Sequence, residues 1–382
     1  MEQLTLMWLK QNDIFSAKIS SSGMNSGKKI VTIDLFSGCG GLSYGLIEAG
    51  FNIILGIDHW APSLETFKRN HPEAKTLCAD ISKLTGKNIT KITERKVDLI
   101  VGGPPCQGFS LSGPRNFFDP RNRLYLDFIR LVKELKPQAF IIENVPGLAS
   151  LFGGQIKDRI IKEFNKLGYT VSAQVLNSSD YGVPQNRKRI VFVGLKGKTV
   201  FEFPRTTHFL NNTKSPQGKN KVTVAEAIGD LPTLRKGIGA EEAEYTKPAM
   251  SNYQKKLRKG SEKIYNHVAS KHTKKTTEII ALVPEGGNYK DLPDNLKKTR
   301  NFHVAWTRLH SKKPSPTIDT GHRHHFHPSE NRVPTVREAA RIQSFPDTFK
   351  FLGPKTSQYK QVGNAVPPLL AKELGKKLIQ YL

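Results

Sequence analysis

One cysteine lies in a setting that favours nucleophilic chemistry. Cys106 belongs to the loop 102–110, which is rich in glycine and proline and directly follows the apolar run 97–101. In sheets of parallel strands, ligands bind at the carboxyl ends of the strands. A cysteine at such a place is exposed, and its thiolate is a strong nucleophile. We therefore predict that Cys106 attacks a bound substrate.

An acid and two arginines lie where they could assist this thiolate. Glu143 directly follows the apolar run 139–142, so its carboxyl group is expected at the same edge of the sheet as Cys106. Arg187 and Arg189 stand at the beginning of another apolar run, and the alternation of side chains along a strand would direct both to one face. The acid and the two arginines are therefore expected near the same edge of the sheet as Cys106.

A glycine-rich turn between a predicted strand and a helix is the candidate cofactor loop. It contains Phe36, Gly38, Gly40 and Gly41. Glycine lets the backbone approach a ligand closely, with a helix N-terminus behind it. Asp58, at the end of the second strand, is placed to accept hydrogen bonds from ribose hydroxyls. The pattern indicates a nucleotide-like cofactor, although Ser43 replaces the last glycine of a dinucleotide fingerprint. A plain tight turn is the alternative.

The elements that must position these side chains alternate along the first half of the chain. Runs of β-branched and aliphatic residues predict strands at 30–36, 53–57, 97–101, 139–142 and 189–193. Helical patterns lie between them, the clearest at 45–50 and 125–135. Continuous apolar strands that alternate with helices predict an α/β fold, with a doubly wound, mostly parallel sheet of the Rossmann-like kind that is covered on both faces.

The overall composition is that of a soluble globular protein. Of the 382 residues 37% are hydrophobic, and the mean hydropathy is −0.44. No apolar run approaches the roughly 18 residues of a membrane span, and the first residues do not resemble a secretory signal. Three cysteines without a CxxC spacing indicate a reducing cytosol and neither a disulfide framework nor a zinc ribbon. Cys39 is expected in a loop and Cys78 in the core.

The charge distribution indicates a polyanionic partner. Lys and Arg outnumber Asp and Glu by 59 to 33, a net charge of +26. Nucleic acid is the commonest partner of so basic a protein, and a lysine-rich surface without a partner is the alternative. Residues 195–313 hold 24 basic and 11 acidic residues, half of the excess in under a third of the chain. Regular patterns there are limited to 223–228 and 274–282, so we expect a smaller, irregular domain that binds an anion.

Taken in order, these segments resemble the motifs of the cytosine-5 DNA methyltransferases. The resemblance covers about residues 30–194 and 305–382. Its motifs include Pro105-Cys106, Glu143-Asn144-Val145 and the arginines of 185–190. The segment 337–346 resembles a late structural motif of that family, and its capping-box spacing from Thr335 to Glu338 predicts a helix start. The segment 361–368 resembles the final motif, which returns to the cofactor site.

The resemblance implies a role for each matched residue. S-adenosylmethionine would be bound by Phe36, Gly38, Gly40, Gly41, Asp58, His59, Asp80, Ile81, Pro105, Asn364 and Ala365. Asp58 would hold the ribose, and Asp80 with Ile81 would contact the adenine. His59 stands where the family often has an aromatic residue, with Trp60 next to it, so either ring could pack on the adenine. Cys106, Glu143, Arg187 and Arg189 would be catalytic.

The implied reaction explains why these residue types occur together. Addition of the Cys106 thiolate to carbon 6 of cytosine makes carbon 5 nucleophilic, while Glu143 shares a proton with ring N3 and Arg189 bonds to O2. Carbon 5 then takes the methyl group, and loss of its proton and of Cys106 restores the ring. Such enzymes flip the target base out of the duplex. The reaction needs no metal, so the histidine-rich segment 321–327 is expected to be a loop near the DNA or the hinge.

The domain organisation and the partners follow from both lines of reasoning. We predict a poorly ordered tail (1–28), a catalytic domain that binds S-adenosylmethionine (29–194), a target-recognition domain (195–313), a hinge with the late motif (314–354) and a C-terminal segment that returns to the catalytic domain (355–382). The expected protein is a cytoplasmic monomer that acts on double-stranded DNA. It would protect that DNA within a restriction–modification system, paired with an endonuclease of the same specificity. The segment 109–123 is expected to be a loop that closes over the site, and an ordinary ordered surface loop is the alternative.

Three other functions were compared with this one. A tRNA-methylating relative shares the core motifs, but its typical Cys-Phe-Thr signature does not occur in this sequence. An inactive DNA-binding paralogue would have lost Cys106, Glu143 or Arg189, and all three are present. A nicotinamide enzyme would account for the glycine loop but not for Pro105-Cys106 or the segment 361–368.

Overall fold

The main part of the protein is a seven-stranded sheet in the order β3-β2-β1-β4-β5-β7-β6. The computed structural model describes residues 29–105, 124–150, 154–210, 218–235, 237–297, 306–321 and 324–382. The strands of this sheet are β1 (Val31–Leu35), β2 (Asn52–Asp58), β3 (Lys75–Cys78), β4 (Leu99–Gly102), β5 (Ala139–Asn144), β6 (Tyr169–Asn177) and β7 (Lys188–Lys196). Strands β1 to β5 pair in parallel, and β7 runs antiparallel to both of its neighbours. The predicted α/β fold with a mostly parallel sheet is confirmed.

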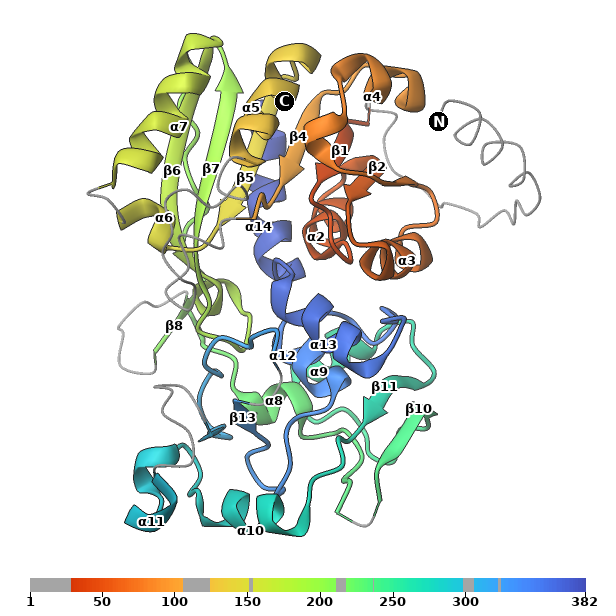
Figure 1. Cartoon of the computed structure of the whole chain (residues 1–382), viewed down its shortest axis with the longest axis vertical. Helices are drawn as coiled ribbons and strands as arrows, with labels where there is room; N and C mark the ends of the chain where they lie inside the picture. The colour runs from red at the N-terminus through yellow and green to blue at the C-terminus, as the bar shows by residue number, and fades with distance from the viewer. Residues whose placement is uncertain are drawn as a thin grey trace, which may run out of the picture.

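Helices cover both faces of the sheet (Figure 1). One face packs against α4 (Gly86–Thr93), α5 (Leu124–Leu135) and α7 (Gln155–Lys166), and the other against α2 (Gly41–Glu48), α3 (Ala61–Asn70) and α14 (Pro368–Leu378). The short helix α6 (Gly147–Ser150) follows β5. All of β1 is buried because alternate residues enter the two cores: Ile33 and Leu35 lie on the α5 side. This double burial explains the continuous apolar runs in the sequence.

A second region lies beyond the sheet, in the lower part of Figure 1. Its helices are α8 (Val224–Ile228), α9 (Asn252–Arg258), α10 (Lys274–Leu282), α11 (Asp294–Lys297), α12 (Val336–Ile342) and α13 (Lys355–Asn364). Its strands form the pairs β8 (His208–Phe209) with β9 (Lys219–Asn220), β10 (Gly239–Ala243) with β11 (Ile264–Val268), and β12 (Thr307–Arg308) with β13 (His325–Phe326). Apolar residues of α8, α9, α12 and α13 share one core. The two segments expected to be regular, 223–228 and 274–282, contain the helices α8 and α10.

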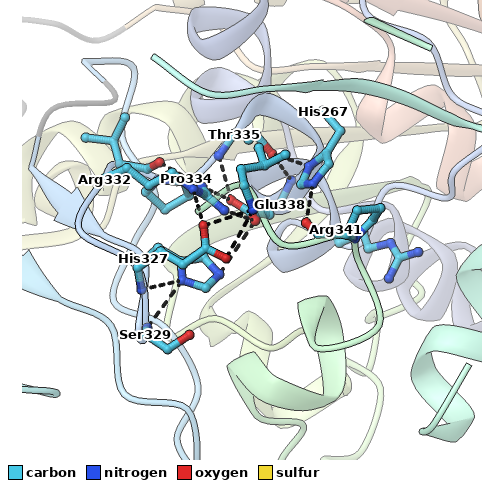
Figure 2. Close-up of polar contacts among 12 residues, drawn as sticks. His267, His327, Ser329, Arg332, Pro334, Thr335, Glu338 and Arg341 are labelled. Carbon is cyan, nitrogen blue, oxygen red and sulfur yellow. Dashed lines mark hydrogen bonds and ion pairs between the residues drawn. The ribbon is translucent and has the colours of Figure 1, made fainter. Parts of the chain in front are cut away.

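Buried ion pairs fix α12 within this second region. Thr335 and Glu338 form the capping box expected from their spacing. The Glu338 carboxylate also accepts hydrogen bonds from both terminal nitrogens of Arg332, at 2.7 and 2.8 Å. Figure 2 shows that His327 also lies close to this carboxylate, with its Nε2 3.6 Å from Glu338 Oε1. The late motif therefore holds α12 in place through ion pairs, because each charged side chain in it lies next to a side chain of opposite charge.

Two expectations about the sheet need correction or extension. Cys78 was expected in the core and is exposed, because β3 is the edge strand of the sheet. The strands β3 and β6 were not expected, and both lie at edges, where a strand needs fewer apolar residues.

The predicted tail 1–28 lies outside the described residues. No helix in the described ranges is long and apolar enough to cross a membrane.

Candidate functional site

The candidate cofactor loop, residues 36–41, follows β1 in a strained backbone conformation. Phe36, Gly38 and Gly40 all have positive φ, at 61°, 54° and 92°. A Cβ atom at Gly40 would lie 2.2 Å from the imidazole of His71, so this position has no room for a side chain. At Gly38 no described atom comes within 4 Å of the Cβ position. Glycine therefore serves one purpose at Gly40, which is close packing, and another at Gly38, which leaves the surface of the loop open.

Asp58 holds this loop against the end of β2. Its Oδ2 accepts a hydrogen bond from the Gly38 N–H and its Oδ1 one from the Trp60 N–H, both at 2.9 Å. His59 Nδ1 lies 3.4 Å from the same carboxylate, while 74% of the His59 side chain is exposed. The Trp60 ring lies under Lys360, whose Nζ is 4.5 Å from the ring centroid. The His59 ring thus lies next to the acid that was expected to hold the ribose, whereas Trp60 contacts that acid through its backbone N–H.

Asp80 and Ile81 follow β3 at the same edge of the sheet. Asp80 caps a single 3-10 turn, Ile81–Lys83, and its Oδ1 accepts hydrogen bonds from the Ser82 N–H and hydroxyl. These bonds lower the pKa of the exposed Asp80 carboxyl group. Ile81 is buried in the core beneath it. The turn therefore presents the carboxylate of Asp80 at the surface, just after the strand that pairs with the strand of Asp58.

The C-terminal segment packs directly on the cofactor loop. A Cβ atom at Gly41 would lie 2.4 Å from the carbonyl oxygen of Val366, and one at Gly45 would lie 2.3 Å from that of Pro368. Asn364 is exposed at the end of α13, and Ala365 is half-buried after it. Figure 1 shows α14 running from the second region up along the sheet domain, where it packs against α2. The structure thus brings residues 364 and 365 next to the loop, across more than 300 residues of sequence.

Glu143 and Arg189 form an ion pair at the carboxyl end of β5. Arg189 Nε lies 3.0 Å from Glu143 Oε1, and both side chains are largely buried. The other carboxylate oxygen of Glu143 lies beside Gly103, whose Cβ position is 3.2 Å away. The Asn144 amide donates a hydrogen bond to the Pro104 carbonyl at 2.9 Å. The acid of the predicted catalytic group is therefore fixed against the segment that leads through Pro105, at the end of the described range, to Cys106.

Arg187 is buried more deeply than its neighbour. It precedes β7, is 1% exposed, and donates hydrogen bonds to the carbonyls of Ile318 at 3.3 Å and Gly363 at 2.9 Å. Burial lowers the pKa of Arg187 well below its usual range, Arg189 lowers it further, and Glu143 opposes the shift. Arg187 thus lies within electrostatic range of Glu143 and also joins the backbone at Ile318 to the end of α13.

Two glutamines complete this connection and were not singled out from the sequence. Gln185 donates a hydrogen bond to the Gln343 side chain and accepts one from the Ile318 N–H at 3.0 Å. Gln343 in turn donates to the Ala365 carbonyl at 2.6 Å. Buried amide groups need such partners. Both glutamines lie in segments that resemble family motifs, 185–190 and 337–346, and this position was a signal that they belong to the site. Their pairing could not be predicted, because it depends on contacts between segments about 160 residues apart.

Several predicted features lie outside the described residues or have structural roles. Cys106 and the segment 109–123 are outside the described ranges. In the histidine-rich segment, His324 bonds to Asp319, and the His327 Nδ1 accepts hydrogen bonds from the Ser329 and Glu330 N–H groups. Among the described residues, no group of three or more His, Cys, Asp or Glu side chains could hold a metal ion. Cys39 is buried, and burial raises the pKa of its thiol to about 12.

Similarity to known proteins extends over nearly the whole chain. Residues 30–380 match the family model of the C-5 cytosine-specific DNA methylases. The chain is 40% identical to the type II methyltransferase M.DdeI of Desulfomicrobium norvegicum, over 91% of this chain and 88% of that protein. It is 39% identical to the type II methyltransferase M1.HphI of Haemophilus parahaemolyticus, over 91% of this chain and 86% of that protein.

A solved structure agrees with these matches. A prophage-encoded protein of E. coli, described as a DNA modification methyltransferase, superposes with a TM-score of 0.73 and 29% identity. The superposition covers 92% of this chain and 99% of the other. Sequence, fold and the order of the motifs lead to one conclusion: the chain belongs to the C-5 cytosine-specific DNA methylase family and is a DNA (cytosine-5)-methyltransferase.

Proposed function

We propose that this enzyme methylates carbon 5 of one cytosine within a specific duplex DNA sequence, and that the product protects the host DNA against an endonuclease of the same specificity. The observation that carries the proposal is the buried pair of Glu143 and Arg189, with its nitrogen and oxygen 3.0 Å apart. It lies at the carboxyl edge of the sheet, where the loop 36–41, Asp58 and the Pro104 carbonyl also lie. The names of the type II relatives support the protective role.

The residues at this edge fit S-adenosylmethionine. The loop surface at Gly38 is open, and the buried Ser37 hydroxyl has no hydrogen-bond partner among the described residues. A buried polar group without a partner is costly, so a bound ligand is a natural partner for it. Asp58 would hold the ribose, and Asp80 with Ile81 would border the adenine. When bound, the cofactor supplies an electrophilic methyl group on its sulfonium.

The side chains of the site would activate the cytosine. The Cys106 thiolate forms a bond to carbon 6, and the electron pair of the C5–C6 double bond moves toward N3, where the proton shared with Glu143 receives it. Arg189 fixes the Glu143 carboxyl group and donates a hydrogen bond to O2, where negative charge also develops. Carbon 5 would then take the methyl group, whose bond to the sulfonium sulfur breaks and leaves its electron pair on sulfur, while the proton on N3 returns to Glu143. The C5 proton would leave to solvent, its electron pair would re-form the C5–C6 double bond, and the C6–sulfur bond would break to release the Cys106 thiolate.

Arg187 would position this group instead of contacting the base. Its terminal nitrogens are occupied by the Ile318 and Gly363 carbonyls, while Glu143 and Arg189 lie close enough to influence its pKa. This arrangement supports a role in which Arg187 ties the end of α13 to the catalytic pair. The flipped cytosine would then meet a site whose two halves come from distant parts of the chain.

A library of random-sequence duplexes tests the proposal. The enzyme is incubated with S-adenosylmethionine and the library, and modified positions are read by bisulfite sequencing. We expect 5-methylcytosine at one position of one short sequence, and resistance of that sequence to an endonuclease that cuts it. The variant Cys106→Ser, which lacks the nucleophile, should leave the library unmodified. Methylation without sequence preference, or of tRNA and not of the duplexes, would overturn the proposal.

A further inference from the structure

Asp34 is a buried carboxyl group that the reaction above does not use. It lies on β1, two residues before Phe36, and its side chain is 1% exposed. It points to the α2 side of the sheet, where the Ser43 hydroxyl donates a hydrogen bond to its Oδ2 at 2.6 Å. Its neighbours across the sheet are Gly56 and Val101. A carboxylate is costly to bury at the centre of a sheet unless a charge nearby compensates for it.

No compensating positive charge acts on Asp34 within the described part of the chain. From β2, Asp58 faces it and repels its ionised form; from the loop, the neutral thiol of Cys39 lies near both acids. The strand β4 contributes no titratable side chain, and the first turn of α2 contributes the Ser43 hydroxyl. Burial is the main reason that the Asp34 pKa rises to about 7, Asp58 raises it further, and the Ser43 hydrogen bond opposes the rise. Asp34 therefore titrates near neutral pH, where a nearby charge can change its protonation.

The two forms of the cofactor differ by one positive charge, and the surroundings of Asp34 described above contain no such charge. S-adenosylmethionine carries a sulfonium and has a net charge of +1 near neutral pH, whereas S-adenosylhomocysteine has an uncharged thioether and a net charge of zero. A cation held by the loop 36–41 would favour the ionised form of a carboxyl group buried next to that loop. The thioether would not do so.

We propose that Asp34 senses the charge of the cofactor: binding of the sulfonium form releases the proton of Asp34 to solvent, and binding of the thioether product does not. The inference rests on the proposed function, since it requires that the loop 36–41 and Asp58 bind the cofactor. Methyl transfer removes the positive charge, so Asp34 takes up a proton again when the product forms. The enzyme consequently prefers substrate over product more strongly at higher pH.

Calorimetry of cofactor binding measures this proton directly. Each ligand is titrated into the whole protein at pH 7 in buffers with different enthalpies of ionisation, and the slope of the binding enthalpy gives the number of protons released. If the sulfonium lowers the Asp34 pKa by about one unit, S-adenosylmethionine releases about 0.4 proton and S-adenosylhomocysteine close to none. The affinity ratio of the two ligands then rises about fivefold between pH 6 and pH 8.

Three variants test whether the proton released on cofactor binding comes from Asp34. Asp34→Asn should abolish the difference between the two ligands. Thr32→Val, on the same strand and equally buried, should retain it. Ser43→Ala keeps the carboxyl group but removes the hydrogen bond that lowers its pKa, so the pH of maximal release should move upward.

The outcomes separate this inference from the proposed function. Equal proton release with both ligands, or a difference that persists in Asp34→Asn, overturns the role of Asp34 while cofactor binding stands. If Asp34→Asn does not fold, a pH of maximal release that fails to move in Ser43→Ala overturns it instead. Failure of both ligands to bind wild-type protein would contradict the assignment of the cofactor site itself.

Discussion

Removing the charge of Glu338 without changing its shape should destabilise the protein strongly. Glu338 is 1% exposed and accepts hydrogen bonds from Arg332 Nη1 and Nη2 and from the Thr335 N–H. Glutamine at this position can still close the capping box. It leaves the buried Arg332 with Glu330 as its remaining acid, 2.8 Å away. Breaking a buried ion pair costs about 3–5 kcal/mol, and we expect Glu338→Gln to lose about 3 kcal/mol because Glu330 remains.

A second capping box in the same chain provides the matched control. Thr223 and Glu226 make the same reciprocal hydrogen bonds at the start of α8, but Glu226 is exposed and has no ion pair in the described structure. Glu226→Gln should therefore cost less than about 0.5 kcal/mol. Urea unfolding followed by tryptophan fluorescence and circular dichroism measures both variants. A loss in Glu338→Gln that lies within about 1 kcal/mol of the control would refute the idea that the buried charge pair anchors α12.

Three further predictions concern the site and its surroundings. Asp58→Ala removes the acceptor of the Gly38 and Trp60 N–H groups. Measured by calorimetry, it should weaken S-adenosylmethionine binding at least about tenfold and leave the DNA affinity in the absence of cofactor unchanged. An unchanged affinity for the cofactor would contradict this prediction. Arg187→Lys cannot reach both the Ile318 and Gly363 carbonyls and should cost about 2 kcal/mol in urea unfolding, so a stability equal to wild type would exclude its positioning role. Burial lowers the pKa of His71 to about 4, below the value of about 6.5 in the unfolded chain, so the folded state binds fewer protons than the unfolded state. The contribution of neutral His71 to the free energy of unfolding is therefore complete above pH 6.5 and falls by about 3 kcal/mol as the pH drops to 4. His71→Gln should flatten this part of the stability profile, and an unchanged profile would show that His71 is not its source.

The central strands were predictable because each is buried on both faces. The continuous runs at β1, β4, β5 and β7 follow from that double burial. The reversed direction of β7 does not show in its own residues. It follows from β6, an edge strand that was not recognised and that precedes β7 without an intervening α-helix, and such neighbours pair antiparallel.

The sequence also indicated which residues could form the site, but not how they are connected. The positions of Glu143 and Arg189 after and within predicted strands were sufficient to expect them at one edge, where the structure places their ion pair. The buried state of Arg187 depends on carbonyls of Ile318 and Gly363, which are more than 130 residues away in sequence. Asp34 lies within the predicted strand 30–36, yet its burial beneath α2 becomes visible only when the helix is packed on the strand.

The central claim is that Cys106 forms a covalent bond with carbon 6 of the target cytosine, and trapping that bond tests it most directly. A duplex with 5-fluorocytosine at the position identified from the library is incubated with the enzyme and S-adenosylmethionine. Fluorine cannot leave carbon 5 as a proton does, so methyl transfer should stop at a covalent complex that survives denaturation. Mass spectrometry of the digested complex should locate the DNA on Cys106. Absence of the complex with a duplex whose unfluorinated form is methylated, or attachment to any other residue, would contradict the mechanism.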